Sequence, residues 1–146
     1  MIAVVGHIER IVQRDGLYAA LRLRNARTPH RFTGLFRFER DLLRNVCLFD
    51  RFDPEVRESG DTPVRDTYRG LIDHKAGVIE FGDVALPDAG VARLNSPVVS
   101  CCGVAINDVM GRQVGSLCHH DLRPCEERIS DRRRLRAAAP GLLPHL

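Results

Sequence analysis

Cysteine and histidine side chains are the groups in this sequence whose types and spacing could do chemistry. Cys118, His119 and His120 are consecutive and Cys125 follows, so thiolate and imidazole metal ligands lie close together along the chain. On a β-strand, however, Cys118 and His120 would share one face while His119 points to the other, so the three could not meet at one ion. The chain also lacks the paired CxxC or HxxxH units of structural zinc sites. We therefore expect no metal site.

Redox chemistry is the second possibility that the cysteines raise. It requires a thiolate whose pKa is lowered by nearby positive charge, and a resolving thiol within reach. Cys101 and Cys102 are adjacent, so their side chains would diverge on a strand, and either one would need a partner from another strand, Cys47 or Cys118. The odd number of cysteines, five, predicts reduced thiols. A redox-active enzyme or thiol switch that uses these four cysteines stays open as an alternative function.

Length and composition predict one globular domain. The 146 residues are 44% apolar and 28% charged, and a chain of this size buries about two-thirds of the surface that it exposes when unfolded. The 22 basic and 19 acidic residues alternate along most of the sequence, whereas a nucleic-acid surface needs clustered basic residues. The opening apolar run, residues 1–5, is too short for a signal peptide or a membrane-spanning helix. We expect a cytoplasmic protein without a nucleic-acid or membrane partner.

Three segments are predicted to be helices, one near each end of the chain and one in its middle. The first helix covers residues 6–24, with a weak point at Asp15 and Gly16. The second begins at Thr62–Pro63 and ends near His74 and Lys75, where the helix dipole favours cations. The third covers residues 124–139, and we expect its three consecutive arginines, residues 132–134, to be solvated or to lie at an interface.

Five apolar segments have the length and alternation of strands, namely residues 31–39, 42–52, 77–81, 98–106 and 113–120. The first two are joined by Arg40 and Asp41 as a tight hairpin, and Gly111 suits a turn that needs a positive φ. Both faces of this first hairpin are apolar, which predicts a sheet covered on both sides. Gly103 and Gly115 lie inside strands, where glycine indicates close approach of a neighbour. The order of elements predicts an α+β domain.

Two segments in the second half carry a family resemblance. Residues 100–106 are Ser-Cys-Cys-Gly-Val-Ala-Ile, and residues 111–121 are Gly-Arg-Gln-Val-Gly-Ser-Leu-Cys-His-His-Asp. They resemble the signature of the GAF domain, in which Y-C-G-V-P-L leads through D-x-x-G-R into x-G-T-L-C-x-x-D. Upstream segments, residues 32–38, 43–51 and 65–68, resemble the corresponding parts of small bacterial GAF proteins, so the resemblance covers about residues 16–135.

The resemblance implies a single GAF-like domain over residues 1–146. Its fold would be α+β, with a central antiparallel sheet of five to six strands flanked by helices, and with a small-molecule pocket on one side. Together with strand parity, the resemblance implies that this pocket is lined by Phe36, Asn45, Cys47, Tyr68, Ile72, Ser100 and Cys102, with Arg69 as an anion anchor.

The sequence departs from the family pattern where the pocket wall is expected. Cys101 and Ala105 stand where many GAF sequences have an aromatic residue and a proline, and Arg69 stands where a cysteine is frequent. The residues after Tyr68 also lack the cysteine and histidine that attach a bilin in some relatives. The ligand and any cofactor are therefore unknown.

The resemblance makes a non-enzymatic sensory or regulatory domain the leading functional hypothesis. Such a domain binds a small molecule, dimerises through its terminal helices and signals to a separate output protein. The alternative is a thiol enzyme like the free methionine sulfoxide reductases of the family. Those reductases carry a cysteine-bearing loop before the core strand, whereas residues 82–97 of this chain contain no cysteine. A third hypothesis is an interaction module whose pocket is filled by its own side chains.

Overall fold

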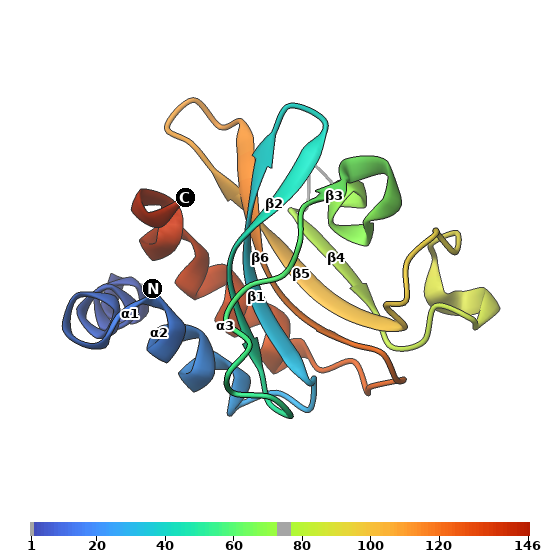
Figure 1. Cartoon of the computed structure of the whole chain (residues 1–146), viewed down its shortest axis with the longest axis horizontal. Helices are drawn as coiled ribbons and strands as arrows, with labels where there is room; N and C mark the ends of the chain where they lie inside the picture. Colours follow the sequence, from blue (N-terminus) through green and yellow to red (C-terminus); the bar gives the residue numbers. More distant parts are fainter. Residues whose placement is uncertain (1, 73–76) are drawn as a thin grey trace.

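A six-stranded sheet forms the centre of the computed structural model, which describes residues 2–72 and 77–146 (Figure 1). The strand order is β3-β2-β1-β6-β5-β4, and every neighbouring pair is antiparallel. The predicted α+β fold with a central antiparallel sheet is confirmed. The strands are β1 (Phe32–Glu39), β2 (Leu42–Asp50), β3 (Thr62–Pro63), β4 (Val78–Phe81), β5 (Ser100–Asn107) and β6 (Gln113–Asp121).

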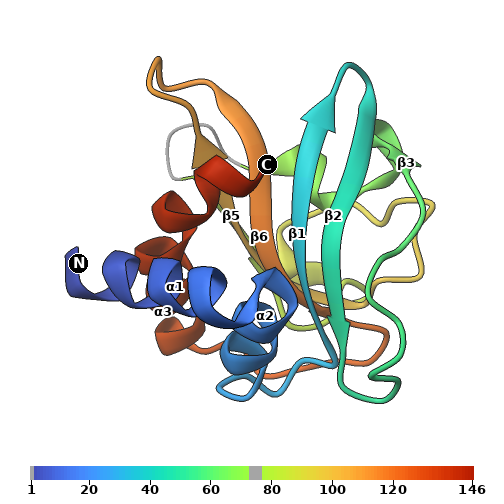
Figure 2. The ribbon, with the colours of Figure 1, turned by 60° about the vertical axis from the view of Figure 1, so that its left-hand side comes forward.

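Helices from both ends of the chain cover one face of this sheet (Figures 1 and 2). They are α1 (Ile2–Asp15), α2 (Leu17–Asn25) and α3 (Ile129–Ala138), and the 3-10 helix η4 (Ala139–His145) continues from α3. Gly16 separates α1 from α2 with a φ of 91°, a conformation that glycine adopts without steric cost. The expected single helix is therefore broken at its predicted weak point.

The middle helix expected from Thr62 onward does not form. Instead Thr62–Pro63 pairs with β2 as the short strand β3, and two 3-10 helices follow, η1 (Val64–Asp66) and η2 (Tyr68–Leu71). Thr67 is extended between them, and its hydroxyl accepts from the Gly70 N–H while donating to the Val64 carbonyl. This side chain satisfies backbone groups that a continuous helix would pair, so it interrupts the helix. The predicted helix end at His74 and Lys75 lies outside the described residues.

The last helix begins later than the sequence indicates, at Ile129 rather than at residue 124. The segment before it is held in an extended path, because the Cys125 N–H donates to the Gly82 carbonyl at 3.0 Å.

The turns between strands are as predicted, since Gly111 has a φ of 80° and Arg40, in the β1–β2 hairpin, has a φ of 59°.

Apolar side chains pack on both faces of the sheet, as the first two strands predicted. Alternation along the strands sends neighbouring residues to opposite cores, Leu35 toward the helices and Phe36 away from them. The same alternation separates Cys102, on the helix side, from Cys101. The cores on the two faces therefore have different chemistry, and thiols contribute to both.

A buried polar network ties α2 to the sheet. Asn25 Nδ2 donates to the Thr33 hydroxyl on β1 at 2.9 Å and to the His30 carbonyl at 3.0 Å. Arg51 Nε donates to Asn25 Oδ1 at 3.0 Å. The Thr33 hydroxyl also lies 2.7 Å from Nδ1 of His119 on β6. Burial lowers the pKa of His119 well below its ordinary value, so this imidazole is neutral in the folded protein.

Candidate functional site

A cavity of about 330 Å³ opens on the face of the sheet away from the helices. Its walls come from β1, β2 and β6, from the turns that follow β3, and from the loop before β5, which Figure 1 shows on this side of the sheet. We call it the sheet cavity. It is lined by Phe32, Phe36, Leu48, Ser59, Thr62, Asp66, Thr67, Arg69, Asn95, Ser96, Pro97, Val98, His120 and Leu122.

Arg69 brings a positive charge into the sheet cavity. Its guanidinium carbon lies 4.3 Å from the centre of the Phe36 ring, a cation–π geometry. Its Nε is buried and has no hydrogen-bond partner within the described chain, and no described carboxylate forms an ion pair with it. Because an unpaired buried donor is costly, this arginine is suited to receive an anionic group from a ligand.

His120 supplies an imidazole to the same cavity. Its ring stacks on Phe32 with centroids 4.9 Å apart, and Nδ1 lies 3.6 Å from Cys118 Sγ. His119 points to the opposite face, toward Thr33, as strand alternation predicted. His120 is absent from the pocket residues that the sequence predicts, although its shared parity with Cys118 is the pattern that indicates this face.

Two buried thiols lie next to these cavity residues. Arg69 Nη1 is 3.9 Å from Cys118 Sγ. Burial alone would raise the pKa of Cys118, but a hydrogen bond with the Cys101 thiol, the charge of Arg69 and the contact with His120 outweigh burial and lower this pKa well below its ordinary value. The hydrogen bond with Cys118, together with burial, raises the pKa of Cys101. Cys118 is therefore the more acidic member of the pair.

The structure brings together four of the eight predicted pocket residues. Phe36 and Arg69 line the sheet cavity. Tyr68 and Ile72 are buried in the core on the same face, without lining the cavity. Tyr68 has a positioning role, because its hydroxyl accepts from the Leu94 N–H at 2.9 Å and so holds the loop that closes the cavity.

The other four predicted residues are placed elsewhere. Cys47 and Cys102 pack in the core beneath the helices, and Ser100 shares the parity of Cys102 and donates to the Arg123 carbonyl. The side-chain amide of Asn45 bonds to nearby backbone groups instead of facing the cavity. Its Nδ2 donates to the Leu35 and Cys47 carbonyls of the β1–β2 hairpin, and its Oδ1 accepts from the Ser59 N–H. The prediction assigned each of these residues to one face of the sheet, and the sequence does not determine which face of each strand lines the pocket.

The sequence predicts no metal site, and the possible ligands among the described residues are arranged as follows. Within residues 2–72 and 77–146 no group of three or more histidine, cysteine or acidic side chains is arranged to hold a metal ion. All five cysteines are free, and Cys125 lies apart from Cys118, with its thiol 3.6 Å from Asp121. Among the same residues, no helix has the length and apolar character needed to cross a membrane.

Comparison with known proteins shows that the chain has the GAF fold. The GAF domain of a phosphoenolpyruvate-protein phosphotransferase from Acinetobacter superposes with a TM-score of 0.73 at 10% identity, covering 99% of this chain and 90% of that chain. A putative GAF sensor protein from Burkholderia vietnamiensis gives 0.70 at 12% identity, with coverages of 99% and 91%. A free methionine-R-sulfoxide reductase from Neisseria meningitidis gives 0.70 at 18% identity, with coverages of 97% and 85%. No protein-family model and no curated protein matches the sequence.

Proposed function

We propose that this GAF-fold domain binds a small molecule with an anionic group in the sheet cavity and acts as a sensory or regulatory domain. The observation that carries the proposal is Arg69, whose buried Nε has no partner among the described residues and whose guanidinium lies against Phe36 in that cavity. Guanidinium groups bind carboxylates through two parallel hydrogen bonds. The ligand is expected to present its carboxylate or similar anion to Arg69.

The remaining lining residues favour an amino-acid-like ligand. Asp66 offers a carboxylate to a positive group, while Leu48 and Val98 add apolar side chains to the wall. A volume of about 330 Å³ is at the lower end of small-molecule sites. The cavity therefore suits a molecule of the size of one amino acid better than a tetrapyrrole.

A chain of contacts connects the cavity wall to the terminal helices and supports a sensory role. His120 lines the cavity, and its neighbour His119 lies against Thr33, which accepts a hydrogen bond from Asn25 at the end of α2. A ligand that shifts β6 would therefore act on the helix layer. A homodimer formed through these helices and a separate output protein are parts of the proposal.

The proposal predicts that an amino acid or amino-acid analogue raises the melting temperature of the wild-type protein but not of Arg69→Gln. A panel of free amino acids that includes methionine sulfoxide is tested by thermal shift. Ligand present at 100 times its Kd stabilises the fold by about 2.7 kcal/mol, which corresponds to roughly 5–10 °C for a domain of this size. Arg69→Gln removes the anion-binding group and should abolish the increase.

Arg65→Gln is the matched control, because Arg65 is exposed on η1 and does not line the cavity. This variant loses one positive charge, as Arg69→Gln does, but ligand should still raise its melting temperature as much as that of the wild type. Melting temperatures that stay flat over the whole panel, or an equal increase in Arg69→Gln, would contradict the proposal.

A second candidate function is favoured by the position of Cys118, whose sulfur lies 3.9 Å from Arg69 Nη1 and 3.6 Å from His120 Nδ1, two residues that line the sheet cavity. In a sulfoxide reductase, the Cys118 thiolate would attack the sulfoxide sulfur with uptake of a proton, releasing the thioether and leaving Cys118 as a sulfenic acid. The Cys101 thiol would then form a disulfide with Cys118 and release water, and an external dithiol would reduce that disulfide.

This candidate predicts a thiolate that forms below the ordinary cysteine pKa of about 8.5. The far-ultraviolet absorbance of thiolate, followed against pH, should show one such step in the wild type and in Cys125→Ser, and no such step in Cys118→Ser. Dithiothreitol-dependent loss of methionine sulfoxide should depend on Cys118 in the same way. If the acidic step is present while methionine sulfoxide is bound but never reduced, the sensory function stands and the enzymatic one fails.

A further inference from the structure

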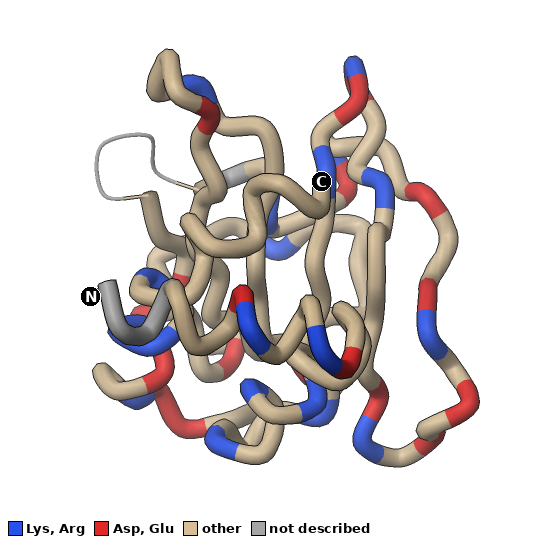
Figure 3. The backbone as a smooth tube through the Cα atoms, turned by 90° about the vertical axis from the view of Figure 1, so that its left-hand side faces the viewer, with Lys and Arg blue, Asp and Glu red and all other residues tan. Residues whose placement is uncertain are grey.

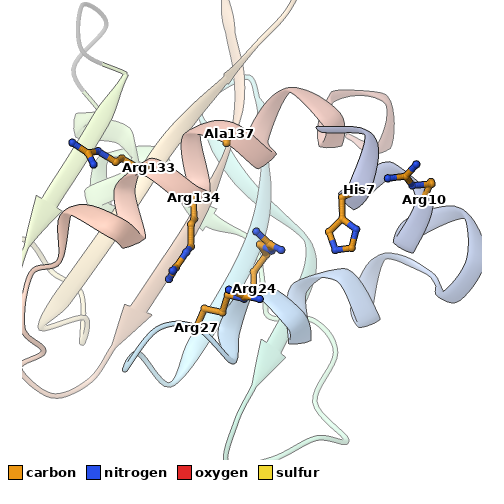
Figure 4. A pocket seen from close by; sticks show the side chains of 7 residues that line it. All are labelled: His7, Arg10, Arg24, Arg27, Arg133, Arg134 and Ala137. Carbon is orange, nitrogen blue, oxygen red and sulfur yellow. The ribbon is translucent and has the colours of Figure 1, made fainter. Parts of the chain in front are cut away.

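A second hollow lies on the other side of the molecule, between the helices that cover the sheet. It has a volume of about 600 Å³ and shares no residue with the sheet cavity. We call it the arginine groove (Figure 4). Figure 3 shows the helix face of the molecule, with basic positions on several helix turns. The groove is lined by His7, Arg10, Arg24, Arg27, Arg133, Arg134 and Ala137.

The positive charges of this groove are not neutralised by the described part of the chain. No acidic residue lines it, and none of its five arginines forms an ion pair with a described carboxylate. Some arginines outside the groove are paired, as Arg31 is with Asp50 and Arg132 with Glu80. The nearby Asp131 is already engaged by Arg128 and Thr28. Four of the five arginines are exposed and only Arg24 is partly buried, so the groove concentrates positive charge that no described carboxylate neutralises.

Arg24 is the most constrained of these side chains. Its Nε is buried and has no hydrogen-bond partner among the described groups. Burial lowers the pKa of Arg24, and the positive charges of Arg27 and Arg134 lower it further, so Arg24 is repelled by both neighbours. Such an arrangement is stabilised when an anion enters between the charges.

The three arginines come from segments far apart in the sequence and converge on one region. Figure 4 shows Arg24 and Arg27 side by side at the end of α2, Arg134 of α3 directed toward them, and Arg133 directed away. Convergence on a point suits a compact group with several negative charges, whereas an extended acidic peptide would need cations spread along a track. The volume lies within the range of small-molecule sites.

We propose that the arginine groove binds a small molecule that carries a di- or triphosphate group, with Arg24, Arg27 and Arg134 holding the phosphates. Guanidinium groups match phosphate oxygens in both charge and geometry. The groove is a site additional to the sheet cavity, so the protein would take up two ligands of different chemistry on opposite faces of its sheet.

Isothermal titration with inorganic tripolyphosphate, and separately with ATP, tests the proposal in buffer free of phosphate. Wild-type protein should bind tripolyphosphate, and Arg24→Gln and Arg134→Gln should each weaken binding about tenfold or more. Arg134 is exposed, so its variant keeps the test valid if Arg24→Gln fails to fold. Tighter binding of ATP than of tripolyphosphate would show that the nucleoside also makes contacts.

The controls separate a built site from general charge attraction. Arg93→Gln removes an exposed arginine outside both hollows, and Arg69→Gln removes the cation of the sheet cavity. Both should bind tripolyphosphate as the wild type does. Without ligand, Arg24→Gln should melt no lower than the wild type, because it removes a partly buried charge that has no partner.

Three results would overturn the proposal. The first is no binding of tripolyphosphate to the wild type, and the second is an equal loss of affinity in Arg93→Gln. The third is tighter binding of a glutamate-rich peptide of the same charge, which would make the groove a docking site for an acidic protein segment.

Discussion

Replacement of Gly115 by alanine is expected to destabilise the protein by about 3 kcal/mol, the upper end of the usual cost of overpacking. A Cβ at this position would collide with the backbone carbonyl oxygen of Phe36 and would lie 2.7 Å from a methyl carbon of Leu146. Gly115 is paired with Arg37 in the β1–β6 ladder, so the carbonyl can move only if the two strands separate. The melting temperature should fall by roughly 6–12 °C.

Gly60→Ala is the matched control for this glycine. No atom lies within 4 Å of a Cβ built there, and its φ is not in the positive range. Its denaturant midpoint should stay close to that of the wild type, while the midpoint of Gly115→Ala falls at an unchanged m-value. Equal midpoints for the two variants would show that β1 and β6 tolerate a side chain between them.

Replacement of Asn25 by alanine is expected to lower the free energy of unfolding by about 3 kcal/mol, since several buried polar groups lose their partner at once. The Thr33 hydroxyl and the His30 carbonyl each lose a donor, and the charged Arg51 loses an acceptor. A buried carbonyl left unpaired costs more than the lost hydrogen bond itself contributed. Arg51 is exposed and keeps its Nη2 hydrogen bonds to the Asn25 and Thr28 carbonyls, so the loss of its Nε acceptor adds less.

Asn107→Ala provides the comparison for Asn25, because Asn107 is exposed at the end of β5. Equilibrium unfolding in urea should give this variant a stability within about 0.5 kcal/mol of the wild type. If Asn25→Ala were equally mild, the network would not be what holds α2 on the sheet, and the proposed path from His120 to the helices would lose its support.

The strands and their alternation could be predicted because they depend on neighbours along the chain. Period-two patterns at β1 and β2 give one set of apolar residues to each face, and both faces are covered. The breaks at Gly16 and Gly111 could also be predicted, since glycine adopts a positive φ that other residues avoid. The 3-10 helices around Thr67 were missed because helical propensity was overruled by one hydroxyl that bonds to its own backbone.

The sequence predicted only part of the lining of the sheet cavity. Phe36 and Arg69 were expected at the pocket and line it, whereas Cys47 and Cys102 lie on the other face of the sheet. Alternation determines which residues share a face, but it does not say which of the two faces the helices will cover. The acidity of Cys118 likewise depends on Arg69, which is distant in sequence and approaches it only in the folded chain.

By itself the sequence predicted an α+β fold with a central antiparallel sheet, a resemblance to GAF domains, five of the six strands, the glycine turns and the separation of His119 from His120. Only the tertiary structure decided which face is hollow, which thiol is acidic and which arginines converge. Thr28 and Asp131, 103 residues apart, bond to each other beside the same helices that carry Arg24 and Arg134. Local patterns record the conformational preferences of neighbouring residues, whereas a site depends on charges and packing between segments that the sequence keeps far apart.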